Sequence, residues 1–113
     1  MILRKWSARI QTAQADAHIA YVEETGATHY AATEGNLGYQ ILLRDLGDGT
    51  SEVSTVSWWS DFDAVRRFAG EDYSIARYYP EDDLYLLERP EFVEHHEVRS
   101  SDGTRSGGHA HGY

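Results

Sequence analysis

Alternating apolar and polar positions open the chain over residues 1–10. The apolar side chains recur at every second position, which places them on one face of an extended backbone. That face carries Ile2, Trp6, Ala8 and Ile10. The pattern predicts a first β-strand with one buried face.

A helical pattern follows over residues 12–24. Several alanines favour helix there, and apolar residues recur at three- and four-residue spacing. Thr12 is of a residue type that caps helix N-termini, and Gly26 stands where a glycine often ends a helix. We therefore predict one helix, followed by a loop over residues 27–36.

Two further extended runs follow that loop. Residues 37–46 alternate in side-chain character, and residues 51–59 are rich in valine and end in two adjacent tryptophans. Between the runs lies Asp48-Gly49, a dipeptide typical of the tight turn of a β-hairpin. We predict that these two strands pair antiparallel.

A second helix is predicted to begin at Ser60 or Asp61. Both residue types cap helices, apolar residues recur at helical spacing after them, and Gly70 marks the end. A shorter helical piece is predicted over residues 73–79, because the proline that follows cannot continue a helix.

The last part of the domain has weaker signals. Residues 81–88 fit either a helical turn or a short strand, and the pattern does not decide between them. Residues 91–99 alternate and are rich in β-forming side chains, which predicts the last strand.

The predicted elements follow the order strand, helix, strand, strand, helix, strand. This βαββαβ order is that of the ferredoxin-like α+β fold, a four-stranded antiparallel sheet with both helices on one face. Residues 1–99 would form this single domain. If the second sheet face is apolar, pairing of two sheets across a twofold axis would cover it, so we expect a homodimer.

Composition narrows the chemistry. The 113 residues are 41% hydrophobic, which suits one globular domain. The chain has no cysteine, which excludes disulfides, thiol nucleophiles, iron–sulfur clusters and cysteine-ligated zinc. No apolar run resembles a signal peptide or a membrane span, so we expect a soluble cytoplasmic protein.

The charge is concentrated in one region. The formal net charge is −9, and residues 71–97 hold nine acidic residues against two arginines. Such a surface repels phosphate backbones and anionic lipids, so neither nucleic acid nor a membrane is an expected partner.

Residues 100–113 form a Ser/Gly/His tail that is predicted to be flexible. His109 and His111 lie two residues apart in it. Together with His95 and His96 they are at most a weak metal-binding set, and we predict no metal centre.

Seven residues are candidates for a functional site. His95 and His96 are candidate general bases, because an imidazole titrates near neutral pH. Neighbouring strand residues point to opposite faces, so one histidine would face a pocket and the other would not. The candidate substrate-binding residues are aromatic or cationic: Trp58, Trp59, Tyr73, Arg77 and Tyr78.

Four segments resemble the antibiotic biosynthesis monooxygenase-like group of the dimeric α/β-barrel superfamily, and the likeness spans residues 1–99. The segments are Ser57-Trp58-Trp59-Ser60-Asp61-Phe62-Asp63-Ala64, Phe68-Ala69-Gly70, Ala76-Arg77-Tyr78-Tyr79-Pro80-Glu81-Asp82 and Val93-Glu94-His95-His96-Glu97-Val98. The resemblance implies a dimeric barrel with one pocket per protomer between sheet and helices. Members of this group include cofactor-independent oxygenases of aromatic polyketides or quinols and heme-degrading oxygenases.

This chain departs from both kinds of oxygenase at informative positions. Polyketide oxygenases place an asparagine four residues before a tryptophan and a tyrosine six after it. If that tryptophan is aligned with Trp59, Thr55 and Val65 occupy those places. Heme-degrading members use a histidine of the second helix, and this chain has none between Trp59 and Pro90.

Two functions are compatible with these patterns. The first is an enzyme that oxidises an aromatic or conjugated substrate without a cofactor, or that transfers a proton in an isomerase or lyase reaction. Its pocket would lie near the strand end at Trp58 and Trp59. The second is a non-catalytic dimeric module that binds a small hydrophobic ligand.

Overall fold

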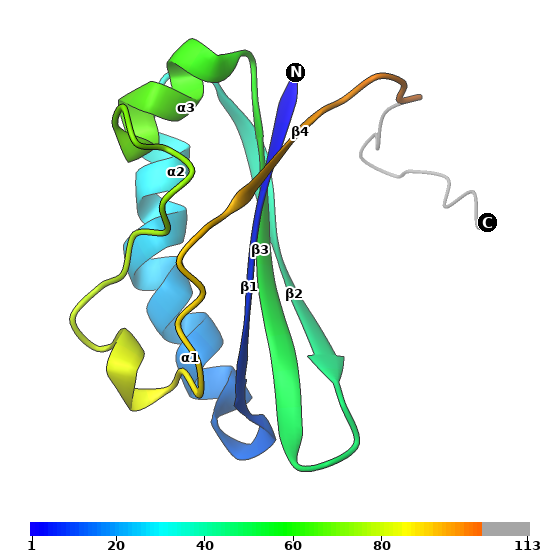
Figure 1. Cartoon of the computed structure of the whole chain (residues 1–113), viewed down its shortest axis with the longest axis vertical. Helices are drawn as coiled ribbons and strands as arrows, with labels where there is room; N and C mark the ends of the chain where they lie inside the picture. Colours follow the sequence, from blue (N-terminus) through cyan, green and yellow to red (C-terminus); the bar gives the residue numbers. More distant parts are fainter. Residues whose placement is uncertain (103–113) are drawn as a thin grey trace.

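The structure, a computed structural model, describes residues 1–102 and contains one antiparallel sheet of four strands in the order β2-β3-β1-β4. The strands are β1 (Ile2–Gln11), β2 (Asn36–Asp45), β3 (Thr50–Trp59) and β4 (Glu94–Glu97). All helices lie on one face of this sheet (Figure 1). The predicted ferredoxin-like α+β fold is confirmed, whereas the predictions for residues 103–113, including His109 and His111, lie outside the described residues.

The two central strands carry most of the pairing. β1 and β3 are antiparallel along their full length, from Ile2 opposite Trp59 to Gln11 opposite Thr50. The predicted hairpin joins β2 to β3, and Gly49 in its turn has a φ of 86°, which other residues rarely adopt.

The first helical region is longer than predicted. It begins with a 3₁₀ turn (Thr12–Gln14) and runs through α1 (Ala15–Val22), a π-helical turn (Glu23–Ala27) and α2 (Thr28–Ala32). Gly26 therefore does not end the helix, and residues 28–32 are not a loop. The side chains of Thr25 and Thr28 donate to the carbonyls of Tyr21 and Glu23, which satisfies backbone groups at the π turn.

The predicted N-cap at Thr12 is also wrong. Gln11 precedes the 3₁₀ turn, and no side chain caps it. The hydroxyl of Thr12 instead shares a 2.8 Å hydrogen bond with that of Ser51 on β3. The Thr12 hydroxyl is therefore bonded to Ser51 of β3 and does not cap the helix.

The second helix is as predicted. In α3 (Phe62–Ala69), the Asp61 carboxylate accepts a hydrogen bond from the backbone N–H of Ala64, and Gly70 follows the last residue with a φ of 84°. Its start packs closely on Gly35, where an added Cβ would lie 2.4 Å from the Cβ of Ala64. Only glycine fits there, so α3 is seated directly against the start of β2.

The segment between α3 and β4 differs from prediction. Residues 73–79 form no helix, because their backbone pairs with residues 91–93 through bonds such as Ala76 N–H to the Glu91 carbonyl. A 3₁₀ turn (Asp82–Leu84) and a bridge from Leu86 to Ile10 occupy the region that fitted either a turn or a strand. The last strand is correspondingly shorter than predicted.

The core lies between the inner sheet face and the helices. One cluster surrounds the fully buried Trp59 and includes Tyr30, Val65 and Phe68, and a smaller one surrounds Ile10. None of the helices within residues 1–102 is long and apolar enough to cross a membrane.

Candidate functional site

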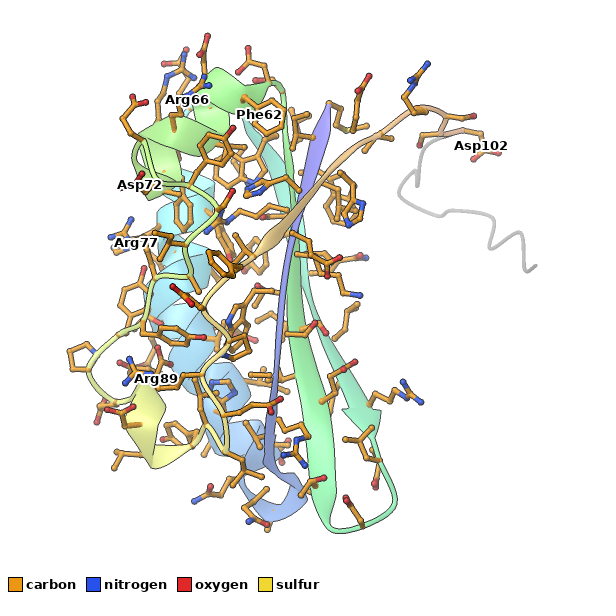
Figure 2. The ribbon with its side chains drawn as sticks, viewed as in Figure 1. Phe62, Arg66, Asp72, Arg77, Arg89 and Asp102 are labelled. Atoms are coloured by element: carbon orange, nitrogen blue, oxygen red, sulfur yellow. The ribbon has the colours of Figure 1, made fainter. Side chains whose placement is uncertain are left out.

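A cavity of about 60 Å³ lies between the inner sheet face, the first helical region and the extended segment that follows α3. Figure 2 shows Arg77 on that segment, at the side of the molecule where the helices lie. The lining residues are Arg4, Trp6, Val22, Thr25, Gly26, Tyr30, Thr55, Phe68, Arg77, Tyr78, Tyr79, Asp82 and Val93.

Arg4 is the buried cation of this cavity. It occupies the inner face of β1, is only 4% exposed, and donates from Nη1 to the Tyr73 carbonyl at 2.6 Å and to Nε2 of His95 at 2.9 Å. Burial lowers its pKa, opposed by the nearby Tyr30 hydroxyl and assisted by the positive charge of Arg77. An arginine nevertheless stays protonated at neutral pH, so the cavity wall keeps this charge.

Arg77 supplies a second guanidinium, which lies over the same aromatic ring as that of Arg4. Arg4 and Arg77 each lie 5.6 Å from the centroid of the Phe68 ring, and Arg77 donates to the Phe68 carbonyl. Within residues 1–102, neither arginine has a carboxylate within 4.0 Å. Arg4 is buried and Arg77 is exposed. Two cations that share one aromatic ring, with no carboxylate within 4.0 Å among residues 1–102, form a site that favours an anion.

The tyrosine hydroxyls of the cavity are already hydrogen-bonded. Tyr78 accepts from the Trp6 indole at 3.2 Å and donates to the Pro90 carbonyl. The Tyr79 hydroxyl shares a 2.8 Å hydrogen bond with Nδ1 of His29. Burial raises the pKa of both Tyr78 and Tyr79, so these phenols stay protonated at neutral pH.

Thr55 occupies the place where the polyketide oxygenases have asparagine. It lines the cavity and accepts a hydrogen bond from the Tyr30 hydroxyl at 3.3 Å. Val65 is fully buried in the core and does not line the cavity. Of the two positions that are polar in the polyketide oxygenases, only that of Thr55 therefore has a polar side chain at the cavity.

His95 lies behind the cavity wall. Its Nε2 faces Arg4, which can only donate, so the proton of the neutral ring is on Nδ1. Burial, then the positive charges of Arg4 and His96, lowers the pKa of His95 to about 4. An imidazole that is this weakly basic and already bonded to an arginine is poorly suited as a general base at neutral pH.

The same shift predicts an acid-sensitive fold. The pKa of His95 falls from its usual 6.5 to about 4 on folding, so its contribution to stability is complete above pH 6.5. It is lost progressively as the pH falls from 6.5 to about 4, because the unfolded chain then binds a proton that the folded chain does not. We expect urea unfolding to show a smaller difference between pH 7 and pH 5 in His95→Gln than in the wild type. An equal difference in both proteins would contradict this assignment.

The structure separates the other predicted site residues. Trp59 is fully buried in the core, where its indole donates to the Ser57 hydroxyl, and Trp58 lies on the opposite sheet face. Tyr73 packs edge-on against His95, with ring centroids 5.1 Å apart. His96 is exposed on the opposite face beside Glu94. Of the seven candidates, Arg77 and Tyr78 line the cavity.

Comparison of the sequence with protein-family models and with curated proteins finds no match. Solved structures do match. A crystal structure from Bacillus cereus, named as that of an antibiotic biosynthesis monooxygenase, superposes with a TM-score of 0.62 at 14% identity, covering 90% of this chain and 96% of that one. The chain has the fold of the antibiotic biosynthesis monooxygenases.

Two further structures share this monooxygenase-like fold. One is a point mutant of MhuD with two manganese protoporphyrin IX molecules per active site, with a TM-score of 0.56 at 19% identity over 91% of this chain and 99% of that one. The other is the heme-degrading protein Rv3592 from Mycobacterium tuberculosis in heme-free form, with a TM-score of 0.50 at 19% identity over 91% and 100%.

The cavity residues do not fit heme. Among the described residues that line it there is no histidine, cysteine or methionine to ligate iron, and the three tyrosine hydroxyls are already engaged. A cavity of about 60 Å³ is also small for a tetrapyrrole. No group of three or more histidine, cysteine or acidic residues in residues 1–102 is placed to hold a metal ion.

Sequence analysis missed Arg4 as a site residue, although the signal was present. Arg4 stands between Ile2 and Trp6 in the alternation of the first strand, so the pattern places a cation on the buried face. Arginine is rarely buried in a protein core, so an arginine on such a face indicates a polar site, and here Arg4 lines the cavity.

Proposed function

We propose that this chain is a small-molecule enzyme of the antibiotic biosynthesis monooxygenase type that binds a conjugated substrate as its anion. The observation that carries the proposal is the pair Arg4 and Arg77, which line one aromatic cavity without a carboxylate partner among the described residues. Aromatic walls accommodate a conjugated ring, and the guanidiniums stabilise negative charge on it.

An anion held in this way can react with oxygen without a cofactor. The carbanion form of an activated CH₂ group gives electrons to O₂; one oxygen atom becomes the new carbonyl oxygen, and the other leaves as water with the two hydrogens. The protein's part is to favour the anion electrostatically and to exclude solvent from it. Cofactor independence and substrate class are both parts of the proposal.

Oxygen consumption tests the reaction. A panel of anthrones should show protein-dependent oxygen uptake with formation of one carbonyl and one water per substrate. Quinols should give one quinone and one hydrogen peroxide per O₂ consumed. The matched comparison is protein with Arg77→Gln, which keeps a polar side chain, although a shorter one, and removes the charge. If ligands bind and no oxygen is consumed, the enzyme proposal is wrong and the non-catalytic binding module remains.

We further propose that the protein forms a homodimer through the sheet face opposite the helices. On that face Trp58 lies beside Leu3 on β1, and the buried Val56 lies further along β3. Leu42 on β2 is 46% exposed on the same face. A second copy would cover these groups with an identical surface.

Light scattering after size exclusion tests this interface. We expect a dimer for the wild type and for Trp58→Phe, which preserves an aromatic ring. Trp58→Glu should be monomeric, because a carboxylate would be buried without a partner. A wild type that is monomeric at high concentration would contradict the proposal.

A further inference from the structure

His18 is the buried polar side chain with the least satisfied surroundings. It projects from α1 and is 0% exposed, and neither ring nitrogen has a hydrogen-bond partner among residues 1–102. Its ring packs against Tyr85 at 5.3 Å and against Trp6 at 6.5 Å between centroids. Leaving a buried polar group unpaired destabilises the folded state, so its presence calls for an explanation.

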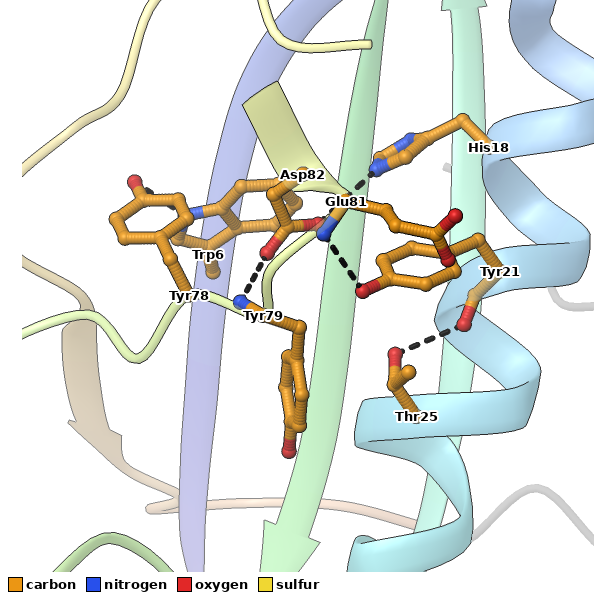
Figure 3. A network of polar contacts seen from close by, with 8 residues as sticks. All are labelled: Trp6, His18, Tyr21, Thr25, Tyr78, Tyr79, Glu81 and Asp82. Atoms are coloured by element: carbon orange, nitrogen blue, oxygen red, sulfur yellow. Dashed lines mark hydrogen bonds and ion pairs between the residues drawn. The ribbon is translucent and has the colours of Figure 1, made fainter. Parts of the chain in front are cut away.

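The nearest charge to His18 is the carboxylate of Asp82. Nε2 of His18 lies 3.9 Å from Oδ1 of Asp82, too far for a hydrogen bond but close enough to become one after a small movement (Figure 3). The other oxygen, Oδ2, accepts the backbone N–H of Tyr79 at 2.6 Å. Asp82 is thus held by one oxygen, while the other faces the imidazole.

The surroundings keep His18 neutral. Burial lowers its pKa, and the negative charge of Asp82 opposes that effect. The ionisable groups that face it come from the segment after the 3₁₀ turn and from α1 itself: Tyr85 packs on the ring, and Tyr21 packs in turn on Tyr85. Trp6, on the strand side, does not titrate.

Asp82 connects this pair to the cavity. It lines the same space as Arg77 and Tyr79, and the charges of both Arg77 and Asp82 act on the Tyr79 hydroxyl. Asp82 is the one carboxylate among the described lining residues. The other described lining residues include no histidine, and the hydroxyls of Tyr30, Tyr78 and Tyr79 are already hydrogen-bonded.

We propose that Asp82 is the proton acceptor of the cavity and that His18, directly behind it, takes up the proton. The substrate class would be weak acids that arrive neutral, such as phenols and enols. This inference rests on the proposed function for the cavity and adds to it the group that makes the anion.

The proton step balances within the protein. The O–H bond of the substrate breaks, its electron pair stays on the substrate oxygen, and the proton binds Oδ1 of Asp82. The proton then passes to Nε2 of His18, which leaves a carboxylate beside an imidazolium. The substrate anion gains the two guanidiniums as neighbours, and no proton has to leave for solvent.

Two probe ligands test the inference on the wild-type protein. The first is 4-nitrophenol, whose ionised form absorbs visible light, bound at a pH below its own pKa. The second is benzoate, which is already an anion and brings no proton. We expect nitrophenol to bind as the phenolate and to shift the His18 ring resonance to that of an imidazolium, whereas benzoate leaves His18 neutral. A bound phenolate with His18 still neutral would overturn the inference.

Two variants supply the matched comparison. Asp82→Asn retains an oxygen for the Tyr79 N–H, and His18→Gln retains a polar group of similar size. In each we expect the ratio of bound phenolate to bound phenol to fall about tenfold, as a shift of one pKa unit would produce. If Asp82 were only a fixed negative charge, Asp82→Asn would raise this ratio, and the inference would be wrong.

The outcomes separate this inference from the proposed function. If neither nitrophenol nor benzoate binds, the anion cavity itself is contradicted. If both bind and His18 does not respond, only the role of Asp82 and His18 fails. Should a variant not fold, the wild-type resonance and absorbance measurements decide the question alone.

Discussion

Arg77→Gln is expected to weaken binding of benzoate or of a phenolate about tenfold to a hundredfold. A hydrogen bond to a charged group contributes about 1.5–3 kcal/mol, and this variant removes one guanidinium from the cavity while Arg4 remains. Calorimetric titration measures the loss directly. Because Arg77 also donates to the Phe68 carbonyl, thermal unfolding should be recorded in parallel, where a small loss of stability is expected.

Arg99→Gln is the matched control for that experiment. It makes the same change in net charge, but Arg99 is 82% exposed beside Glu97 and lies outside the cavity lining. Its affinity for benzoate should equal that of the wild type. If both variants weaken binding equally, the effect arises from overall charge, and the cavity arginine has no special role.

Trp59→Ala is expected to remove a large fraction of the free energy of unfolding. Removing a fully buried tryptophan costs about 3–5 kcal/mol, against a total stability of about 5–15 kcal/mol for a domain. The indole packs against Phe68 at 5.4 Å and against Tyr30 at 6.0 Å between ring centroids. Both rings line the cavity, so the variant should also lose anion binding. Urea unfolding followed by circular dichroism measures the stability.

The neighbouring Trp58→Ala provides a control of the same chemistry. Trp58 lies on the other face of β3 and is only partly buried, so its loss should cost much less than that of Trp59 at equal protein concentration. Equal costs would show that the two faces of this strand do not differ in packing, contrary to the burial in the structure.

Local patterns were sufficient for the elements that carry their own start and stop signals. Asp61 and Gly70 bracket α3, and the Asp-Gly step at residue 48 locates the hairpin, because caps and tight turns depend on neighbouring residues alone. Residues 73–79 carry no such start or stop signal. Their backbone groups find partners in residues 91–93, and no short-range signal reveals that pairing.

The candidate site, too, could be predicted only where the local character of a residue was enough to select it. The aromatic and cationic character of Arg77 and Tyr78 was sufficient to select them, and both line the cavity. His95 was selected for its intrinsic pKa, but its contact with Arg4 spans 91 positions of sequence. The pairing of His18 with Asp82 spans most of the chain as well, so only the folded structure brings the two together.

The π turn gives the cavity wall an unusual tolerance to changes in chain length. A turn with i to i+5 bonding holds one residue more than an α-helical turn, and here it lies between Val22 and Tyr30, which both line the cavity. Deleting one exposed residue, such as Glu24, would convert the turn to ordinary α-helix while α1 and α2 keep their inward faces. Along most of a helix, such a deletion would rotate every later side chain by about 100°. The lining at Thr25 and Gly26 is therefore a place where the cavity can be reshaped by loss of a residue as well as by substitution.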